Sequence, residues 1–442
     1  MNRFALLKQL RCSSATAVVI TAGVVGLTIA SCQSTSNSGG ANQSPATTAT
    51  DNAKGLKLGA LLPATGDLSA VGPPLLDAVS LLVQTVNQCG GVNQAPVSLV
   101  SEDDQTEPAA GAEAMAKLVE VDRVAGVVGS FPSSVSSAAV DVAVRNKVML
   151  ISPASTSPTF TERAKKGDFQ GFWARTAPPD TYQAQALAKL AQQRNYQQVS
   201  TIVINDDYGV GLEREFTQAF KQRGGTVAGE GKPARYDPKA TTFESEAALA
   251  FGNKPDAVAA FIYGETGSLF LKAAYQQGLS QGIQIMLTDG GYSEDFAEQV
   301  GKTKDGKFIL AGAIGTIPSA DGKALAAFTK LWQQKQAKPL SAFVPHAWDA
   351  AALLVLAAEA ADSNTGEGIK SQLREVAGPT GTPVTDVCDG LARLQKGEKI
   401  DYQGASGNVD IDENGDVVSS YDVWTVKDDG TLQTIGKVNP AQ

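Results

Sequence analysis

The chain has 442 residues, more than one hydrophobic core of ordinary size organises, so its length predicts two lobes or domains. Its formal net charge of −9 argues against nucleic acid and against an anionic membrane surface as partners. There is one histidine, and the four cysteines show no metal-ligand spacing, so we expect neither a metal centre nor a cofactor.

The first 31 residues predict an export signal. Three cations come first: Arg3, Lys8 and Arg11. The apolar run at 15–30 is several residues short of the roughly 20 that a membrane helix needs, and a permanent membrane helix is the alternative. Ile-Ala-Ser-Cys at 29–32 resembles the bacterial lipoprotein cleavage box. This resemblance implies that Cys32 carries a lipid and anchors the chain in the periplasm, at the outer face of the cytoplasmic membrane.

Residues 33–54 are rich in Ser, Thr, Asn, Gly and Ala, with almost no charge and no apolar periodicity. Such a segment cannot bury enough surface to offset the entropy lost on ordering. It predicts a disordered tether between Cys32 and a folded part that begins at residue 55.

From residue 57 onward, short β-branched runs alternate with amphipathic helical stretches. We expect strands at 57–62, 97–103, 125–131, 148–152, 199–205, 226–229, 257–263, 283–288 and 308–315. Helices are expected between them, for example at 74–87, where the apolar residues share one face. Repeated strand-helix-strand units predict an α/β fold of two Rossmann-like lobes, each with a central, mostly parallel sheet.

Three interruptions of this pattern predict a three-strand hinge between the lobes. Prolines in Thr-Ala-Pro-Pro-Asp at 176–180 mark the first crossing, and a second fits 312–318. A third precedes a β-hairpin that we expect within 407–426, around an Asn-Gly turn. The predicted lobes are therefore discontinuous: 55–177 and 316–405 form lobe 1, and 178–315 and 406–442 form lobe 2.

Two cysteines remain for the folded part, because Cys12 lies in the predicted signal and Cys32 is the predicted anchor. In an oxidising compartment, the pair Cys89 and Cys388 suggests one disulfide. Two separate thiols are the alternative.

Seven segments carry a resemblance through their order and spacing. They are Gly-Ala-Leu-Leu-Pro-Ala-Thr-Gly-Asp at 59–67, Cys-Gly-Gly-Val-Asn at 89–93, Glu-Asp-Asp-Gln-Thr-Glu-Pro at 102–108, Val-Gly-Ser-Phe-Pro-Ser-Ser at 128–134, Ile-Ser-Pro-Ala-Ser-Thr-Ser-Pro at 151–158, Asp-Asp-Tyr-Gly-Val-Gly at 206–211 and Leu-Thr-Asp-Gly-Gly at 287–291. Together they resemble type I periplasmic binding proteins of the leucine/isoleucine/valine-binding family of ABC transporter substrate-binding lipoproteins, over residues 55–442.

This resemblance implies a clamp that captures a free amino acid, neutral and aliphatic, by closing its two lobes. It also implies the partners: the permease subunits of an ABC importer receive the ligand, and the membrane is contacted through the lipid anchor only. A monomer suits such a shuttle.

The resemblance assigns the ligand α-carboxylate to Ser133 and Thr156, with the backbone of Ala154 and Ser155. Ser133 opens the helical stretch 134–145, and helix N-termini attract anions. The alternative is that Ser133 only caps its helix and Thr156 belongs to an ordinary turn.

Asp289 comes at the carboxyl end of the strand expected at 283–288, where open α/β sheets bind ligands. Its carboxylate suits an α-ammonium group, although the family commonly has Glu there, and capping of the next helix is the alternative. Tyr208 and Tyr263 match family tyrosines that cover the ligand from the second lobe; plain packing is their alternative role.

Phe131, Pro132 and Val71 match family positions that touch the ligand side chain. Val71 stands where an aromatic residue is common, which leaves room for a broader range of neutral side chains. Asp104 and Asp206 are interpreted as acids that steady the loops of the two lobes.

We do not expect catalysis. His346 opens an apolar helix and is interpreted as structural, and neither a Gly-x-Ser-x-Gly elbow nor a phosphate-cradling loop is present. The adjacent acids at 103–104 and 206–207 do not suit acid–base catalysis by paired carboxylates, because neighbouring side chains on a strand or loop point apart. Two other functions stay open: an amino-acid-sensing lipoprotein that uses the same closure, and a binding protein for urea or a short amide, which needs no matched ion pair.

Overall fold

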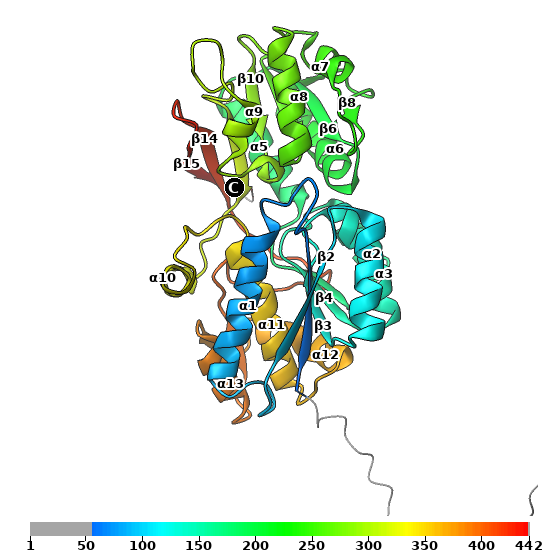
Figure 1. The fold of residues 1–442 in the computed structure, drawn as a ribbon, viewed down its shortest axis with the longest axis vertical. Coiled ribbons are helices and arrows are strands. Elements are labelled where there is room, and N and C mark those ends of the chain that lie inside the picture. Colours follow the sequence, from blue (N-terminus) through cyan, green and yellow to red (C-terminus); the bar gives the residue numbers. More distant parts are fainter. Residues whose placement is uncertain (1–54, 441–442) are drawn as a thin grey trace, which may run out of the picture. The chain divides into compact units, whose positions relative to one another are not determined.

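Two large sheets organise residues 55–440, the part of the chain that the computed structural model describes (Figure 1). The predicted export signal, the Cys32 anchor and the tether lie outside these residues. Among the described helices, none combines the length and the apolar character needed to cross a bilayer.

The first sheet has five parallel strands in the order β2-β1-β3-β4-β5. They are β1 (Lys57–Leu62), β2 (Ser98–Asp103), β3 (Gly126–Gly129), β4 (Met149–Ser152) and β5 (Trp173–Arg175). β3 and β4 are buried throughout, as expected for parallel strands covered on both faces. We call this sheet and the helices packed on it lobe 1.

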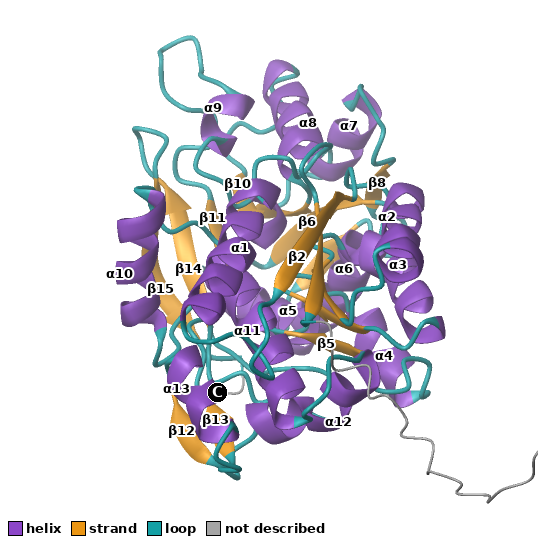
Figure 2. Ribbon diagram, turned by 60° about the horizontal axis from the view of Figure 1, so that its bottom comes forward, coloured by secondary structure: helices purple, strands orange, loops and turns teal. Residues whose placement is uncertain are grey.

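Helices cover both faces of this sheet, with α1 and α11 on one side and α2 and α3 on the other (Figure 1). The helices of lobe 1 are α1 (Gly72–Gln88), α2 (Pro108–Ala116) with a π-helical extension (Lys117–Val121), α3 (Ser133–Arg145), α4 (Pro158–Lys165), α10 (Leu325–Gln336), α11 (Val344–Ala360), α12 (Gly366–Ala377) and α13 (Val387–Leu394). A small parallel pair, β12 (Thr382–Val384) and β13 (Ile400–Tyr402), lies beside α13, apart from the main sheets (Figure 2).

The second sheet has the order β15-β14-β11-β10-β9-β6-β7, with β8 also paired to β6. Its strands are β6 (Gln198–Ile204), β7 (Thr226–Ala228), β8 (Ala234–Tyr236), β9 (Ala257–Phe261), β10 (Gln284–Leu287), β11 (Ile314–Pro318), β14 (Tyr421–Val426) and β15 (Leu432–Val438). All pairs in this sheet are parallel except two: β11 with β14, and β14 with β15. The helices of this lobe 2 are α5 (Asp180–Gln193), α6 (Asp207–Gln222), α7 (Glu244–Phe251), α8 (Gly264–Gln276), the 3₁₀ turn η3 (Asp289–Gly291) and α9 (Phe296–Val300). The predicted α/β fold with mostly parallel sheets is confirmed.

The chain passes between the two sheets three times, and the first passage follows β5, at the predicted prolines. The second passage, predicted at 312–318, lies elsewhere. Residues 309–312 form a turn, and the strand expected at 308–315 is β11, which pairs with β10 and β14. Residues 316–318 therefore belong to the second sheet, and the chain returns to lobe 1 only after Pro318.

The hairpin predicted within 407–426 is also wrong. The Asn-Gly turn forms, with the Asp412 carboxylate accepting backbone hydrogen bonds. Its flanks share one backbone hydrogen bond, from the Asp412 N–H to the Asp416 carbonyl at 2.9 Å, but they form no strand pair. The Gly415 carbonyl instead accepts a hydrogen bond of 2.9 Å from the Arg175 N–H, so this segment lies along β5 in lobe 1. The observed hairpin joins β14 to β15 around Gly430, whose φ of +84° suits a tight turn.

Cys89 and Cys388 form a disulfide with a Cα–Cα distance of 5.9 Å, so the predicted pairing is confirmed over the alternative of separate thiols. The bond ties the C-terminal end of α1 to α13 within lobe 1.

Candidate functional site

Ser133 lies at the first turn of α3, but it does not cap that helix. Pro132 occupies the N-cap position, and the helix has no side-chain cap. The Ser133 hydroxyl is buried and accepts a hydrogen bond of 3.2 Å from the Ser157 N–H. The side chain thus joins the start of α3 to the loop that follows β4.

This loop, residues 153–157, is held by buried serine hydroxyls. The Ser155 hydroxyl donates to the Phe131 carbonyl at 3.1 Å, and the Ser152 hydroxyl donates to the Ser130 carbonyl at 2.6 Å. Ser155 therefore turns its side chain inward and leaves only its backbone for a ligand. The neighbouring Thr156 differs, because its hydroxyl is buried beside Asp180 and makes no hydrogen bond of ordinary geometry.

Arg175 holds the loop through its backbone carbonyls, a role that sequence reasoning missed. Its side chain is fully buried, and Nη1 donates to the carbonyls of Ser155 and Ser157 at 3.0 Å each. Nε pairs with the Asp416 carboxylate at 2.7 Å, which neutralises the buried guanidinium. The two residues that flank Thr156 are thus fixed by one cation.

Asp180 is the second residue that sequence reasoning missed. It begins α5, its backbone N–H donates to the Thr156 carbonyl at 2.8 Å, and its side chain is fully buried. Neither carboxylate oxygen has a hydrogen-bond partner among the described residues. Burial, and then the charge of Asp289, raise the pKa of Asp180 well above its ordinary value. The sequence signal was an acid directly after the Pro-Pro pair at the first crossing.

Asp289 lies where the sequence predicted it, directly after β10 on lobe 2. The side chain is buried and accepts a hydrogen bond of 3.1 Å from the Tyr208 hydroxyl. It does not cap the next helix, α9, which begins seven residues later at Phe296. Burial is the main cause that raises the pKa of Asp289.

Tyr208 and Tyr263 stack on each other, with ring centroids 5.4 Å apart. Both rings are buried, and the Tyr263 hydroxyl donates to the Asp206 carboxylate at 2.8 Å. Asp206 also accepts from the Gly209 N–H as the N-cap of α6, so it steadies this part of lobe 2 and is not an ordinary surface acid. Asp104 has the matching role in lobe 1, where it accepts hydrogen bonds from Ser130 and Thr106.

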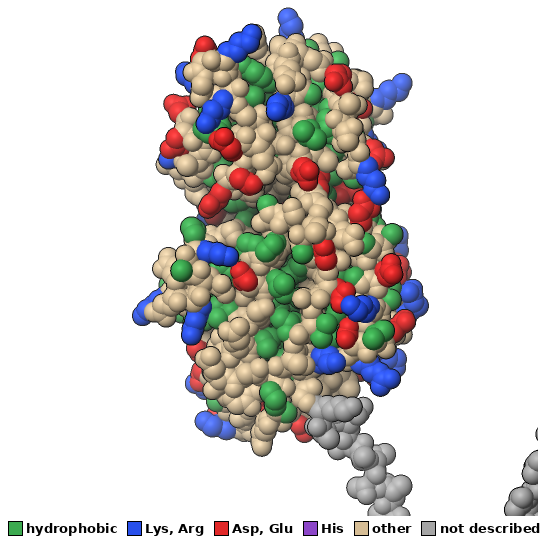
Figure 3. Space-filling model, in the orientation of Figure 1, with side chains coloured by type: hydrophobic (Ala, Val, Ile, Leu, Met, Phe, Trp, Pro, Cys, Tyr) green, Lys and Arg blue, Asp and Glu red, His purple; other side chains and the backbone are tan. Residues whose placement is uncertain are grey.

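The residues assigned to the ligand side chain separate into two groups. Val71 lines a cavity of about 290 Å³ between the lobes, together with Ala70, Pro74, Tyr292, Ser293, Glu294, Asp295, Leu340, Ser341 and Ala342. Phe131 and Pro132 are buried outside this lining, and Phe131 packs edge-on against Phe343 with centroids 5.2 Å apart. Acidic side chains gather on the surface where the two lobes meet (Figure 3).

The structure therefore connects the predicted residues into one chain of contacts. Ser133 reaches the loop of Thr156, Thr156 reaches Asp180, and Asp180 interacts electrostatically with Asp289, which contacts Tyr208. The two lobes also meet there directly, since the Ser157 hydroxyl donates to the Asp207 carbonyl at 2.9 Å. A helix N-terminus that favours an anion thus lies next to two acids that favour a cation.

Comparison with known proteins identifies the family of the chain. Residues 75–429 match the family described as receptor family ligand binding region. A chemotactic signal transduction system substrate-binding protein, BasB of Halobacterium salinarum, is 28% identical over 84% of this chain and 87% of its own length. Leu/Ile/Val-binding protein homolog 2 of Brucella abortus is 28% identical over 75% of this chain and 85% of its own.

A solved structure of a leucine binding protein, LivK from Thermotoga maritima, superimposes with a TM-score of 0.73. It is 26% identical, and the match covers 87% of this chain and 99% of that one. The chain belongs to the receptor ligand-binding family, as a type I periplasmic binding protein of the branched-chain amino acid group.

Proposed function

We propose that the chain is an extracytoplasmic solute-binding protein that captures a neutral, aliphatic amino acid by closing its lobes and delivers it to an ABC importer. The observation that carries this proposal is a surplus of buried acceptors. Both carboxylate oxygens of Asp180 and the Oε1 atom of Gln183 are buried without a hydrogen bond of ordinary geometry, although the Thr156 hydroxyl is near Asp180, and Asp289 lies beside them. Burying such groups without partners is unfavourable, so the site favours a ligand that brings donors and positive charge.

An α-ammonium group fits this requirement because it carries one positive charge and three N–H donors. The carboxylate on the same carbon fits the N-terminal end of α3, next to the free Thr156 hydroxyl. Ser133 and Thr156 stand on lobe 1, whereas Tyr208 and Asp289 stand on lobe 2. A ligand that contacts both lobes binds the closed state more tightly than the open state, because some of its contacts form only on closure.

Urea or a short amide fits less well. Such a ligand is uncharged, so it gains none of the ion-pair energy that these two buried acids offer to an ammonium group. The names of the relatives also describe binding proteins, one of them a Leu/Ile/Val-binding homologue, and none describes an enzyme.

A sensing role is the second candidate, favoured by one observation: BasB is named for a chemotactic signal transduction system. Import and sensing require the same clamp. They differ in the partner that recognises closure: permease subunits for import, and a membrane receptor for sensing. The proposed lipid on Cys32 would hold the clamp at the membrane in both cases.

Calorimetric titration of the purified protein with the standard amino acids, urea and acetamide tests the ligand assignment. We expect micromolar or tighter binding of aliphatic amino acids and none of the amides. Binding of the amides alone would overturn the proposal. Uptake of labelled leucine by cells with and without the gene then separates the two roles: lost uptake supports import, and unchanged uptake with a lost tactic response supports sensing.

A further inference from the structure

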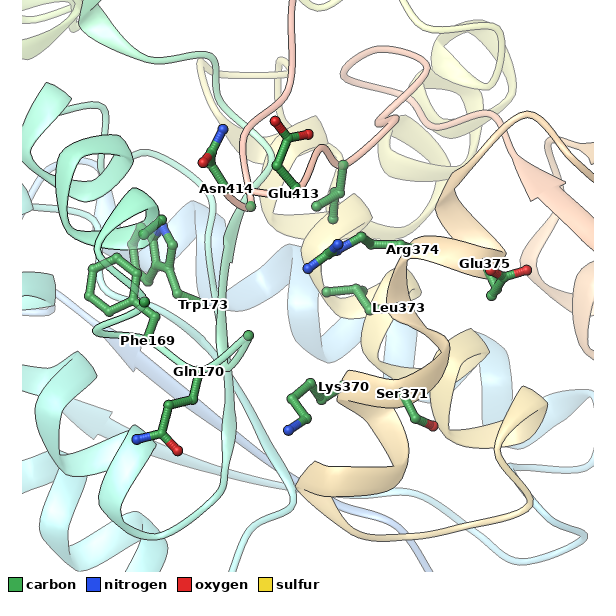
Figure 4. A pocket seen from close by; sticks show the side chains of 15 residues that line it. Phe169, Gln170, Trp173, Lys370, Ser371, Leu373, Arg374, Glu375, Glu413 and Asn414 are labelled. Atoms are coloured by element: carbon green, nitrogen blue, oxygen red, sulfur yellow. The ribbon is translucent and has the colours of Figure 1, made fainter.

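A second cavity lies in lobe 1, outside the amino-acid site. Its volume is about 300 Å³, within the range of small-molecule sites. Three segments surround it: the loop between α4 and β5, helix α12, and residues 411–415 of the third passage between the lobes (Figure 4).

The charges that face this cavity are positive. Figure 4 shows the Arg374 and Lys370 side chains extending from α12 toward the space in front of Trp173, whereas Glu375 and Glu413 point away from it. Arg374 forms no ion pair with any described residue, and Lys370 lies over an aromatic ring without a carboxylate partner. Glu375 pairs with Lys399 at 3.5 Å instead. Two cations without an ion-pair partner within 4 Å among the described residues therefore stand at the cavity, Lys370 half-buried and Arg374 exposed.

The indole of Trp173 forms one wall of the cavity. Trp173 lines the cavity and is only 3% exposed, and its Nε1 atom is shielded from the cavity as well as from solvent. Stacking on Phe160, with centroids 4.2 Å apart, fixes the indole ring. Buried Leu373 and Ile411 supply an apolar wall.

The cavity is connected to the loop of the amino-acid site. Asn414 and Gly415 line it, and the next residue, Asp416, pairs with Arg175 at 2.7 Å. Arg175 in turn donates to the carbonyls of Ser155 and Ser157, on both sides of Thr156. A shift of residues 414–416 therefore moves the group that holds the ligand loop.

From these contacts we infer that the protein has a second site, for a small anion with a carboxylate or phosphate group, and that its occupancy changes the affinity of the amino-acid site through Asp416 and Arg175. The anion would pair with Lys370 and Arg374, against the indole of Trp173. The binding part of this inference is independent of the proposed function, and only the coupling rests on it.

Titration of the purified protein with inorganic phosphate and, separately, with propionate tests the binding. We expect saturable binding of at least one probe, weakened ten-fold or more in the double variant Lys370→Gln/Arg374→Gln. The matched control, Lys330→Gln/Lys335→Gln, changes the net charge equally on the exposed face of α10 and should bind as the parent does. Binding of phosphate alone assigns an oxyanion site, and binding of propionate alone assigns a carboxylate site. Absent binding of both probes, or equal binding by the double variant, overturns the inference.

Titration of L-leucine with and without the saturating probe tests the coupling. We expect leucine affinity to change several-fold, and linkage requires the probe affinity to change by the same factor when leucine is present. An unchanged leucine affinity in a protein that binds the probe overturns the coupling. A protein that binds the probe but no amino acid overturns the proposed function and leaves the second site standing.

Discussion

Asp67, in the loop after β1, accepts two hydrogen bonds from Thr266 in the first turn of α8: one from the backbone N–H at 3.0 Å and one from the hydroxyl at 2.5 Å. The Glu265 N–H donates a third, at 2.7 Å. A carboxylate on lobe 1 thus caps a helix on lobe 2, where the helix dipole favours negative charge. Because the contact joins the two lobes, we expect it to break when they open.

The Asp67→Ala variant should therefore bind amino acids about 10- to 100-fold more weakly, because charge-assisted hydrogen bonds of the closed state are lost. Calorimetry measures the affinity, and small-angle scattering measures whether more molecules stay open in the presence of ligand. Asp305→Ala, at an exposed position, is the control. An affinity equal to that of the control would show that the cap does not contribute to closure.

The Asp180→Asn and Asp289→Asn variants should each lose amino-acid affinity by about 30-fold or more. Removing one partner of a desolvated charge pair costs about 2–5 kcal/mol. The melting temperature of the ligand-free protein should stay equal or rise, because a buried unpaired carboxylate opposes folding. A melting temperature lower by several degrees, together with lost binding, would instead give these acids a structural role.

Amino-acid affinity should fall as the pH is lowered from about 7.5 to about 5. Burial raises the pKa of both Asp180 and Asp289, so lowering the pH protonates them in the ligand-free protein. A protonated carboxyl group cannot pair with ammonium, whereas the charges of the ligand do not change over this range. Binding must then release protons, which calorimetry in buffers of different ionisation enthalpy detects. A pH-independent affinity would contradict the assignment of the ammonium group to this pair.

The regions that sequence predicted well are those governed by local patterns. Apolar runs predicted the strands β3, β4 and β10, whose carboxyl ends precede Ser133, Thr156 and Asp289. That these three residues bind the ligand stays a prediction. The Cys89–Cys388 pairing followed from composition and compartment.

The regions that sequence missed depend on segments far apart in the chain. Asp180 differs from other acids by its burial beside Asp289, and Arg175 differs from other cations by its contacts with Asp416 and the loop of Ser155. The only local signal was the Pro-Pro pair before Asp180, and Arg175 had none. The misplaced hairpin has the same origin. An Asn-Gly turn is a local signal, but its flanks form no strand here, because the Gly415 carbonyl accepts a hydrogen bond from Arg175 of β5, far away in the sequence.

Val71→Trp should narrow the selectivity of the site. Val71 lines the 290 Å³ cavity between α1 and the segment after η3, and an indole ring would fill much of that space. We expect leucine affinity to fall at least ten-fold while alanine affinity stays within about three-fold, measured by calorimetry. Val121→Trp places the same ring at a position that is 71% exposed and is the control. An equal loss for leucine and alanine would mean that the cavity does not receive the side chain.

The Cys89–Cys388 bond should stabilise the protein without contributing to ligand affinity. It closes a loop with a sequence separation of 299 residues, and joins α1 to α13 at the end of lobe 1 away from α8 (Figure 1). Cross-links of this kind stabilise folded proteins by about 2–4 kcal/mol, chiefly by restricting the unfolded chain. Reduction should therefore lower the melting temperature by several degrees and leave leucine affinity unchanged.

The double variant Cys89→Ser/Cys388→Ser is the control for this last experiment. It should melt like the reduced parent, and the reductant should have no further effect on it. If reduction leaves the melting temperature of the parent unchanged, the packing of α1 against α11 holds this end of lobe 1 without the bond. If reduction instead weakens leucine binding, the position of α1, whose N-terminal end carries Val71, depends on a covalent tie at its other end.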